Sequence, residues 1–458
     1  MSESTSPIFA NSADAAPDWR ETYAYTVGMQ AVIYGFPVVK NLQQRYYMVK
    51  QPMGRVDVPV NAWYHQRTPS NAEDKYGSSI IDTLLYSAAW YDVRREPLIL
   101  SVPDAGQSYY SIQFMEIYSD IFAYVGLRAT GNQAGHFAVI GPDWHGELPA
   151  GITASFRAPT PTGMLLGRIN FEARDKLEAA HALQDQTRIA PLSNWQSGSP
   201  FVATERDVLP PGNRQTDPLW FFTILNRGLT ENPPPAKDAN IVAMLASVGL
   251  GPGQSDDLTQ LDAGTQAGLR RAMTDGLAML EQVVKSGGNA KVVNHWAWGQ
   301  MNWGRTHETH DFLTRAATQS LSGMQEHHIE EVVKLRAHHD GEGQLLNGSI
   351  NQYQIHFSKD QIPQAKAFWS ITLYDEKYDL AANALDRYSR GSPDTDLQYN
   401  ADGSLDLWLQ SEVPDASKRT NWLPTPKRPF NLFLRTYLPD QAMMDQTWTP
   451  PPVQKVNA

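Results

Sequence analysis

The chain has 458 residues, of which 41% are apolar and 10% aromatic, and its formal net charge at pH 7 is −11. This length predicts two or three domains with sizeable cores and excludes disorder for most of the chain. The acidic balance and the lack of a Lys/Arg-rich run argue against a nucleic-acid partner. The chain contains no cysteine, which excludes disulfides, thiolate nucleophiles and cysteine-ligated metal sites.

The sequence shows neither a secretory signal nor a membrane-spanning stretch. Residues 1–19 are polar and small, without a basic start or an apolar core. No window approaches the roughly 18 apolar residues that a spanning helix needs. We therefore expect a cytoplasmic protein with no membrane partner, or a periplasmic or secreted one if a leader has been removed. The sequence does not determine the oligomeric state, and a homo-oligomer is possible.

The first part of the chain is expected to be rich in β-structure. After a flexible segment at 1–19, a helix is predicted from Asp18 to Lys50, interrupted by Gly35-Phe36-Pro37. Strands follow at 97–103, 109–124 and 136–140, and the first two are expected to form a hairpin through the turn at 104–107. A short helix is predicted at 177–186. Residues 20–204 thus predict a β-rich N-terminal domain.

The middle of the chain changes to helical periodicity and the end returns to strands. Residues 205–335 predict a largely helical connecting segment, with an apolar stripe over 269–284 and a second helix from Thr309 to Met324. Strands are then expected at 353–357, 368–374, 405–409 and 430–437, with a tight turn that places Gly403 at positive φ. Residues 336–458 therefore predict a jelly-roll-like β-sandwich. The fold class expected is mainly β with a helical middle segment and two β-sandwich or jelly-roll-like domains.

Five ordered motifs within the C-terminal strands resemble the DUF 1214 domain. They are Phe368-Trp369-Ser370-Ile371-Thr372-Leu373-Tyr374-Asp375, Asn383 with Arg387-Tyr388-Ser389, Asn400-Ala401-Asp402-Gly403-Ser404-Leu405, Asn421-Trp422-Leu423-Pro424 and Leu434-Arg435-Thr436-Tyr437. The N-terminal half resembles the DUF 1254 domain that usually precedes it. Its motifs include Ala31-Val32-Ile33-Tyr34-Gly35-Phe36-Pro37, Val102-Pro103-Asp104, Tyr109-Tyr110-Ser111 and Phe122-Ala123-Tyr124-Val125-Gly126.

The resemblance covers nearly the whole chain, and what it implies is structural: a predominantly β protein with a jelly-roll-like C-terminal domain. Fold analogy of this kind gives little information about chemistry. One motif departs from the family, because Asp82-Thr83-Leu84-Leu85-Tyr86-Ser87 contains an additional leucine. Either Asp82 or Thr83 can therefore occupy the position of the family's aspartate.

A carboxylate group at the end of the second predicted strand is the first candidate for catalysis. Alternation places Glu116, Tyr118 and Asp120 on the face that also carries Tyr110 and its apolar neighbours. Burial there would raise the pKa of Glu116, as a general acid requires. The alternative is that the strand emerges into solvent, which would leave these as rim residues.

Two further residues complete the predicted catalytic group. Arg128 could neutralise such a carboxylate or bind an anionic substrate, and its alternative is a surface ion pair. Tyr86 is expected to assist. In the C-terminal domain the predicted substrate-binding residues are Asn383, Arg387, Asn421 and Trp422, because an aromatic ring with amide and guanidinium neighbours suits a sugar or a carboxylate. The alternative is that they anchor long loops.

Several histidines raise the question of a metal site. His307 and His310 lie three residues apart, but the spacing is not that of a zinc protease. The pairs His327-His328 and His338-His339 are expected mainly on a solvated surface. No cofactor is predicted, and a divalent metal stays open as an alternative that would need three converging ligands.

The sequence favours an enzyme acting on a small or carbohydrate-like molecule, of the hydrolase or lyase type, with its site at the junction of the two β domains. One alternative is a non-catalytic protein that binds a glycan or another small ligand. The other is a metal-dependent enzyme that uses His307 and His310. A closed pocket holding a carboxylate would favour the enzyme, and an exposed aromatic platform would favour the binding protein.

Overall fold

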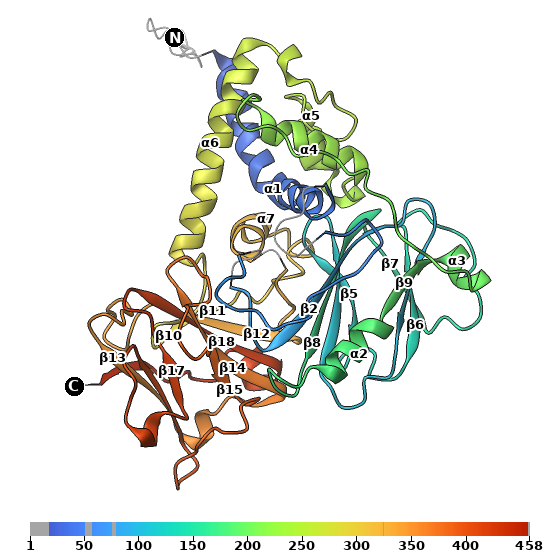
Figure 1. Ribbon diagram of the computed structural model, residues 1–458. Helices are drawn as coiled ribbons and strands as arrows, with labels where there is room; N and C mark the ends of the chain where they lie inside the picture. The colour runs from blue at the N-terminus through green and yellow to red at the C-terminus, as the bar shows by residue number, and fades with distance from the viewer. Residues whose placement is uncertain (1–17, 51–56, 76–78, 324, 457–458) are drawn as a thin grey trace, which may run out of the picture.

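The computed structural model describes residues 18–50, 57–75, 79–323 and 325–456. Three units meet in a triangle: an N-terminal β-sandwich, a C-terminal β-sandwich and a group of helices (Figure 1). The predicted fold class, mainly β with a helical middle segment, is confirmed. Residues 1–17 of the segment predicted to be flexible lie outside the described residues.

The N-terminal sandwich consists of two sheets that enclose an apolar core. The five-stranded sheet has the order β1-β2-β8-β4-β5, with bounds Tyr64–His65, Leu84–Asp92, Thr162–Asn170, Tyr110–Glu116 and Ile121–Gly126. The four-stranded sheet has the order β7-β6-β3-β9, with bounds Ala154–Arg157, Gly135–Ile140, Leu98–Val102 and Arg188–Pro191. Helices α2 (Glu178–Gln186) and α3 (Leu192–Ser197) flank strand β9. Leu85, Leu100 and Phe114 are among the residues of the core.

The hairpin predicted from the first two strands is wrong. Strand β3 pairs with β6 and β9, whereas β4 pairs with β5 and β8 in the other sheet. The turn near Gly106 therefore carries the chain across the sandwich instead of folding one strand onto the next. Both strands are largely buried on both faces, so the alternation along each one could not reveal which sheet it joins.

The C-terminal sandwich is built in the same way. Its six-stranded sheet has the order β10-β11-β12-β18-β14-β15, with bounds Val292–Val293, Trp296–Trp298, Val332–Ala337, Phe430–Pro439, Ala365–Asp375 and Ser389–Gly391. The four-stranded sheet has the order β17-β16-β13-β19, with bounds Trp422–Pro424, Leu405–Gln410, Gln352–Phe357 and Val453–Val456. Gly403 has a φ of 85°, as predicted for the turn before β16. Helix α8 (Gln441–Met444) follows β18.

The helical unit joins segments that are far apart in the sequence. It contains α1 (Trp19–Lys50), α4 (Trp220–Glu231), α5 (Ala239–Ala246) and α6 (Ala263–Ser286). Helix α1, expected within the N-terminal domain, packs on α6 and α4 and continues through Pro37. This packing offsets the cost of about 3 kcal/mol that proline imposes inside a helix, so the predicted interruption is wrong. No described helix is both long and apolar enough to cross a membrane.

The segment predicted to be helical, 205–335, also supplies strands to the six-stranded sheet. Strands β10 and β11 and most of β12 come from it. The helix predicted from Thr309 to Met324 is shorter than expected: α7 spans Phe312–Thr314 and a π-helix spans Arg315–Leu321. Met324 lies outside the described residues.

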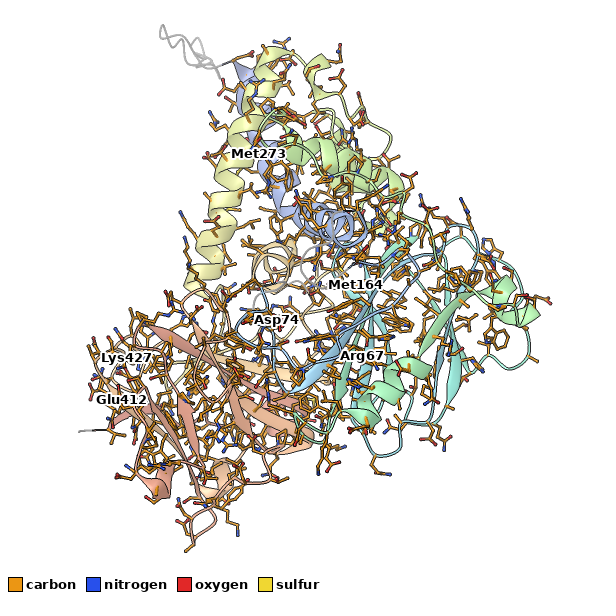
Figure 2. The ribbon with its side chains drawn as sticks, viewed as in Figure 1. Arg67, Asp74, Met164, Met273, Glu412 and Lys427 are labelled. Atoms are coloured by element: carbon orange, nitrogen blue, oxygen red, sulfur yellow. The ribbon has the colours of Figure 1, made fainter. Side chains whose placement is uncertain are left out.

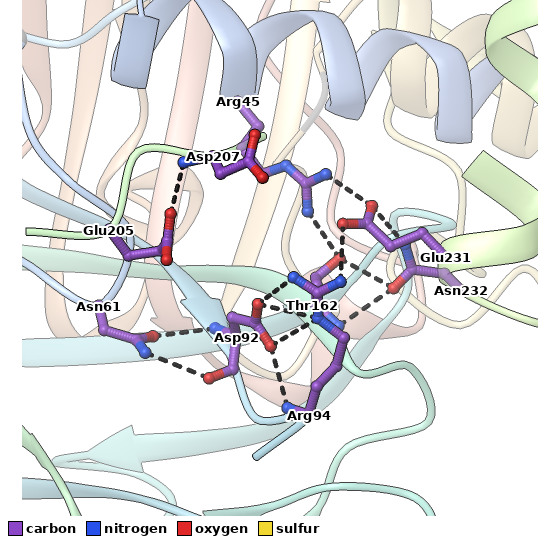
Figure 3. A network of polar contacts seen from close by, with 9 residues as sticks. All are labelled: Arg45, Asn61, Asp92, Arg94, Thr162, Glu205, Asp207, Glu231 and Asn232. Atoms are coloured by element: carbon purple, nitrogen blue, oxygen red, sulfur yellow. Dashed lines mark hydrogen bonds and ion pairs between the residues drawn. The ribbon is translucent and has the colours of Figure 1, made fainter. Parts of the chain in front are cut away.

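A buried polar network fixes the helices to the N-terminal sandwich (Figure 3). The guanidinium of Arg45, on α1, donates to the carboxylate of Glu231 at the end of α4, at 2.6 Å. It also donates to the hydroxyl of Thr162 at the start of β8, at 2.9 Å. The Asn232 side chain accepts from the same hydroxyl. Arg45 thus joins two helices and a strand through one side chain.

Candidate functional site

A cavity of about 480 Å³ lies where the three units meet. Its main walls come from helix α1, from strands β2 and β8 of the first sandwich, from strands β12 and β18 of the second, and from residues 321–323 and 325–327 at and after the end of the π-helix. Met164, which lines it, lies near the centre of the molecule, whereas Glu412 and Lys427 lie at the periphery of the second sandwich (Figure 2). The cavity is therefore at the junction of the two β domains.

The wall contributed by the first sandwich is apolar with one charged corner. Ala88 pairs with Leu166 across β2 and β8, and both line the cavity. One step along the same face, Tyr86 pairs with Arg168, whose guanidinium lies 5.8 Å from the tyrosine ring centroid. The aliphatic surface can hold an apolar body, and the corner can hold a polar group.

The wall contributed by the second sandwich carries two positive charges side by side. Strands β12 and β18 are antiparallel, and their register places Lys334 opposite Arg435 and Val332 opposite Tyr437. All four residues line the cavity. Like charges at directly opposed positions of a sheet destabilise the pairing. An anion in the cavity would relieve this repulsion.

Lys334 is the most constrained of these cations. Its ammonium pairs with the carboxylate of Glu326 and lies 4.7 Å from the ring centroid of Trp303. Only 14% of its side chain is exposed. Burial lowers the pKa of Lys334, and the neighbouring Arg435 lowers it further, against the opposing effect of Glu326.

The two arginines are held by neutral partners. Arg168 donates to the side-chain oxygen of Gln113 at 2.8 Å and to the carbonyl of Gln325 at 2.9 Å. Arg435 donates to the hydroxyl of Tyr374 at 2.9 Å and to the carbonyl of Ser79 at 2.8 Å. These bonds fix the guanidinium planes but leave their charges uncompensated by any carboxylate in the described part of the chain.

His327 lines the same cavity and is buried. Burial and the charge of Arg168 keep its pKa well below the usual value, so the ring is neutral. The Tyr124 hydroxyl accepts from the backbone N–H of His328 and lies 3.3 Å from Nδ1 of His327. We therefore infer that the Tyr124 hydroxyl donates its hydrogen bond to Nδ1. The neutral ring of His327 then carries its own proton on Nε2. Nε2 is buried and has no partner within the described residues.

Of the predicted catalytic residues, Glu116 and Tyr118 lie away from this cavity. Glu116 is buried, and its two oxygens accept the backbone N–H groups of Tyr118 and Asp120, both at 2.8 Å. Burial raises its pKa to about 8. The Tyr118 hydroxyl donates to the carbonyl of Asn232. The structure thus uses both residues inside the protein, where they fix the turn after β4.

The other two predicted catalytic residues are separated. Tyr86 lines the cavity, as described above. Arg128 pairs through Nε with the fully buried Glu331 at 2.5 Å. This bond connects the two sandwiches. It differs from the surface ion pair that the sequence offered as the alternative role of Arg128, because Glu331 is buried. The sequence left open whether Asp82 or Thr83 occupies the position of the family's aspartate. Asp82 is buried and pairs with Arg174 at 2.9 Å.

The four predicted substrate-binding residues anchor loops of the second sandwich. Asn383 bonds the backbone of its own loop through Ala381, Leu385 and Arg387. The Arg387 guanidinium donates to two backbone carbonyls, Asn421 bonds the backbone of Gln398 on both sides, and Trp422 donates to the carbonyl of Gln410. None of the four lines this cavity. Their geometry matches the alternative of loop anchors.

The histidines do not assemble a metal site within the described residues. Nε2 of His307 lies 2.8 Å from the carboxylate of Asp238. The ring of His310 stands edge-on to the ring of His307, and the two ring centroids are 6.4 Å apart. No group of three or more His, Asp or Glu side chains there could hold an ion. The expectation of a solvated surface is wrong for His327, which is 7% exposed, because it packs beneath Tyr124.

Sequence reasoning missed the charged residues of the cavity. Arg168, Lys334 and Arg435 were not singled out, although Arg435 and Tyr437 belong to one of the quoted C-terminal motifs. The signal was available, since each cation interrupts a strand that is otherwise apolar or alternating. A positive charge inside a buried strand needs a partner, and Arg168 and Arg435 have no carboxylate partner among the described residues.

Two family models match the chain, and together they span more than half of it. The first, described as "Protein of unknown function (DUF1254)", matches residues 60–191, and the second, described as "Protein of unknown function (DUF1214)", matches residues 331–441. The chain is a DUF1254–DUF1214 protein. The expected order of the two domains is confirmed.

One solved structure shows the same fold as this DUF1254–DUF1214 protein. The VPA0106 protein from Vibrio parahaemolyticus is 22% identical, with a TM-score of 0.73 over 95% of this chain and 100% of that chain. An uncharacterized protein from Burkholderia cenocepacia is 11% identical, with a TM-score of 0.46 over 95% of this chain and 94% of that one. A comparison with curated proteins found no match.

The cavity lies between the two family domains. Tyr86, Met164 and Arg168 come from the DUF1254 match, whereas Lys334 and Arg435 come from the DUF1214 match. Helix α1 and residues 321–323 and 325–327 lie outside both and complete the walls. The site thus depends on both domains and on the helical unit.

Proposed function

We propose that the protein binds a small organic acid in the cavity between its two β domains. One observation carries the proposal: Lys334 and Arg435 face each other in register, Arg168 stands on another wall, and the lining contains a single carboxylate among the described residues, Glu326. That carboxylate is already paired with Lys334. Enclosed charges without counter-charges are costly, and a bound carboxylate would compensate them.

The remaining lining supports an acid with an apolar body. Met48, Met164, Leu166 and Leu321 supply aliphatic surface, where each buried CH₂ group contributes about 0.8 kcal/mol. A sugar acid would satisfy the same charges, so a carbohydrate-like ligand remains within the proposal.

Calorimetric titration with hexanoate, octanoate and 3-phenylpropanoate tests the proposal, with the corresponding amides as neutral controls. We expect the acids to bind and the amides to bind at least tenfold more weakly, because charge-assisted hydrogen bonds account for the difference. Equal behaviour of acids and amides, or no binding of either, would overturn it.

Substitutions then locate the site. Lys40 lines the cavity from α1 without an ion pair or hydrogen bond in the described part of the chain, so Lys40→Met should weaken acid binding severalfold and leave stability unchanged. Arg435→Gln should weaken it tenfold or more. Arg188→Gln, on the exposed side of β9, is the matched control and should bind as the wild type does.

As a second candidate we propose a hydrolase or lyase that acts on this acid, with Lys334 as the proton-transferring group. The favouring observation is its position in the cavity beside Glu326, where burial lowers its pKa towards the working range of a base. Mass spectrometry of ester-, amide- and hydroxyl-bearing acids, sugar acids included, should show consumption by the wild type. Lys334→Arg should bind the same acid without consuming it, and equal turnover by this variant would exclude the role.

A further inference from the structure

A second, smaller cavity of about 180 Å³ adjoins the first. Five described residues line both cavities: Ser79, Trp303, Leu321, Ser322 and Lys334. The side chains of Trp303 and Lys334 therefore stand between two neighbouring spaces. One elongated molecule that occupied both spaces would pass these two side chains.

The face of the second sandwich continues from one cavity to the other. On β12 the odd-numbered residues Val333 and Leu335 point into the sandwich core. The even-numbered ones, Val332, Lys334 and Arg336, line the cavities in that order. Arg336 lies two residues beyond Lys334, which is about 7 Å along an antiparallel strand.

The second cavity repeats the charge imbalance of the first. Arg336 is half-buried, stands opposite Phe433 in the register and has no ion-pair or hydrogen-bond partner in the described part of the chain. The described residues that line this cavity include no carboxylate. Trp298, Trp303 and Phe433 supply flat apolar surface around the guanidinium. The second space is thus suited to another acidic group at the end of an apolar chain.

We infer that the ligand is an elongated diacid, with one carboxylate bound by Arg435 and Arg168 in the large cavity and the other bound by Arg336 in the small one. Lys334 lies between them and contacts the connecting chain. This inference rests on the proposed binding of an organic acid and specifies its class. Guanidinium groups suit both ends, because their fork geometry matches a carboxylate.

Matched pairs of monoacids and diacids test the inference by calorimetric titration of the full chain. The pairs are hexanoate with hexanedioate and octanoate with octanedioate. We expect the diacid of at least one pair to bind tenfold or more tightly than its monoacid. Arg336→Gln should abolish this advantage and leave the monoacid affinity unchanged, whereas Arg188→Gln should preserve it.

The outcomes separate the two proposals. If monoacids bind and diacids gain nothing, the inference is overturned while the proposed function stands. If Arg336→Gln lowers the affinity for the monoacid and the diacid equally, Arg336 does not bind the second carboxylate, and the inference is likewise overturned. If neither acid binds, the proposed function fails and the inference fails with it.

Discussion

Tyr109 and Tyr110 are neighbours in the chain, and their hydroxyls have opposite surroundings. Tyr109 donates to the buried carboxylate of Glu331 at 2.8 Å, across the boundary between the two sandwiches. The Tyr110 hydroxyl is buried without a partner in the described residues. We expect Tyr109→Phe to lower the free energy of unfolding by about 1.5–3 kcal/mol and Tyr110→Phe to leave it unchanged or raise it. Urea unfolding measures both, and equal losses would contradict the assignment.

Glu116 should make stability depend on pH in a defined direction. Its carboxyl has a folded-state pKa of about 8, raised by burial from 4.5, so the folded protein keeps a proton that the unfolded chain releases. The resulting stabilisation is fully present below about pH 4.5 and is lost as the pH rises through about 8. Relative to Glu116→Gln, the wild type should lose about 1.4 kcal/mol per pH unit in this interval. Denaturant unfolding at several pH values measures this difference. If the free energies of unfolding of the wild type and Glu116→Gln change in parallel with pH, the prediction is contradicted.

At the scale of residues the sequence left the environment of Glu116 open. Alternation along β4 placed it on an inward face, with an exposed rim position as the alternative, and the residue is buried. The turn that follows decides its role, because the backbone N–H groups of Tyr118 and Asp120 occupy both oxygens. The charge of Arg435 within an apolar strand was visible in the sequence, but its position opposite Lys334, which is about a hundred residues away in the chain, was not.

At the scale of elements, α1 and α6 approach each other closely because glycine lies at their contact. A Cβ atom at Gly268 of α6 would lie 2.3 Å from the backbone carbonyl oxygen of Glu21 on α1. We expect Gly268→Ala to lower the free energy of unfolding by about 1–3 kcal/mol, because the helices must move apart. Thr274→Ala, on the exposed face of α6, is the control and should be neutral or stabilising. A stable Gly268→Ala variant would refute this contact.

Strands were predicted where alternation and turns coincide, as for β13, β14, β16 and β18. Strand β12 alternates equally well, but the histidines next to it were interpreted as part of a solvated surface. Pairing was the harder problem, because β3 joins β6 and β9 through contacts that no local pattern contains. Helix α1 tolerates Pro37 for the same reason, since distant helices supply the packing.

At the scale of the molecule, three large cores divide the structure. One combines the helices with a face of the five-stranded sheet, a second fills the N-terminal sandwich on the other face of that sheet, and the third fills the C-terminal sandwich. Because the first two share a sheet, we expect calorimetry of the free protein to show two transitions. Arg45→Met should lower only that of the first core, because it leaves Glu231 with only the longer ion pair to Arg94, at 3.8 Å, and removes a buried pair whose loss costs up to about 3–5 kcal/mol. A shift of both transitions would show that the cores unfold together.

The opposed positions of Lys334 and Arg435 have an evolutionary consequence. A protein selected only for heat resistance would replace one of two facing cations in a sheet, since their repulsion weakens the free state. On the proposed function, their presence together is a compromise between stability and ligand binding. Laboratory evolution towards higher melting temperature without ligand should therefore place a neutral residue at one of these two positions, and we expect the resulting proteins to be more stable and to bind organic acids more weakly.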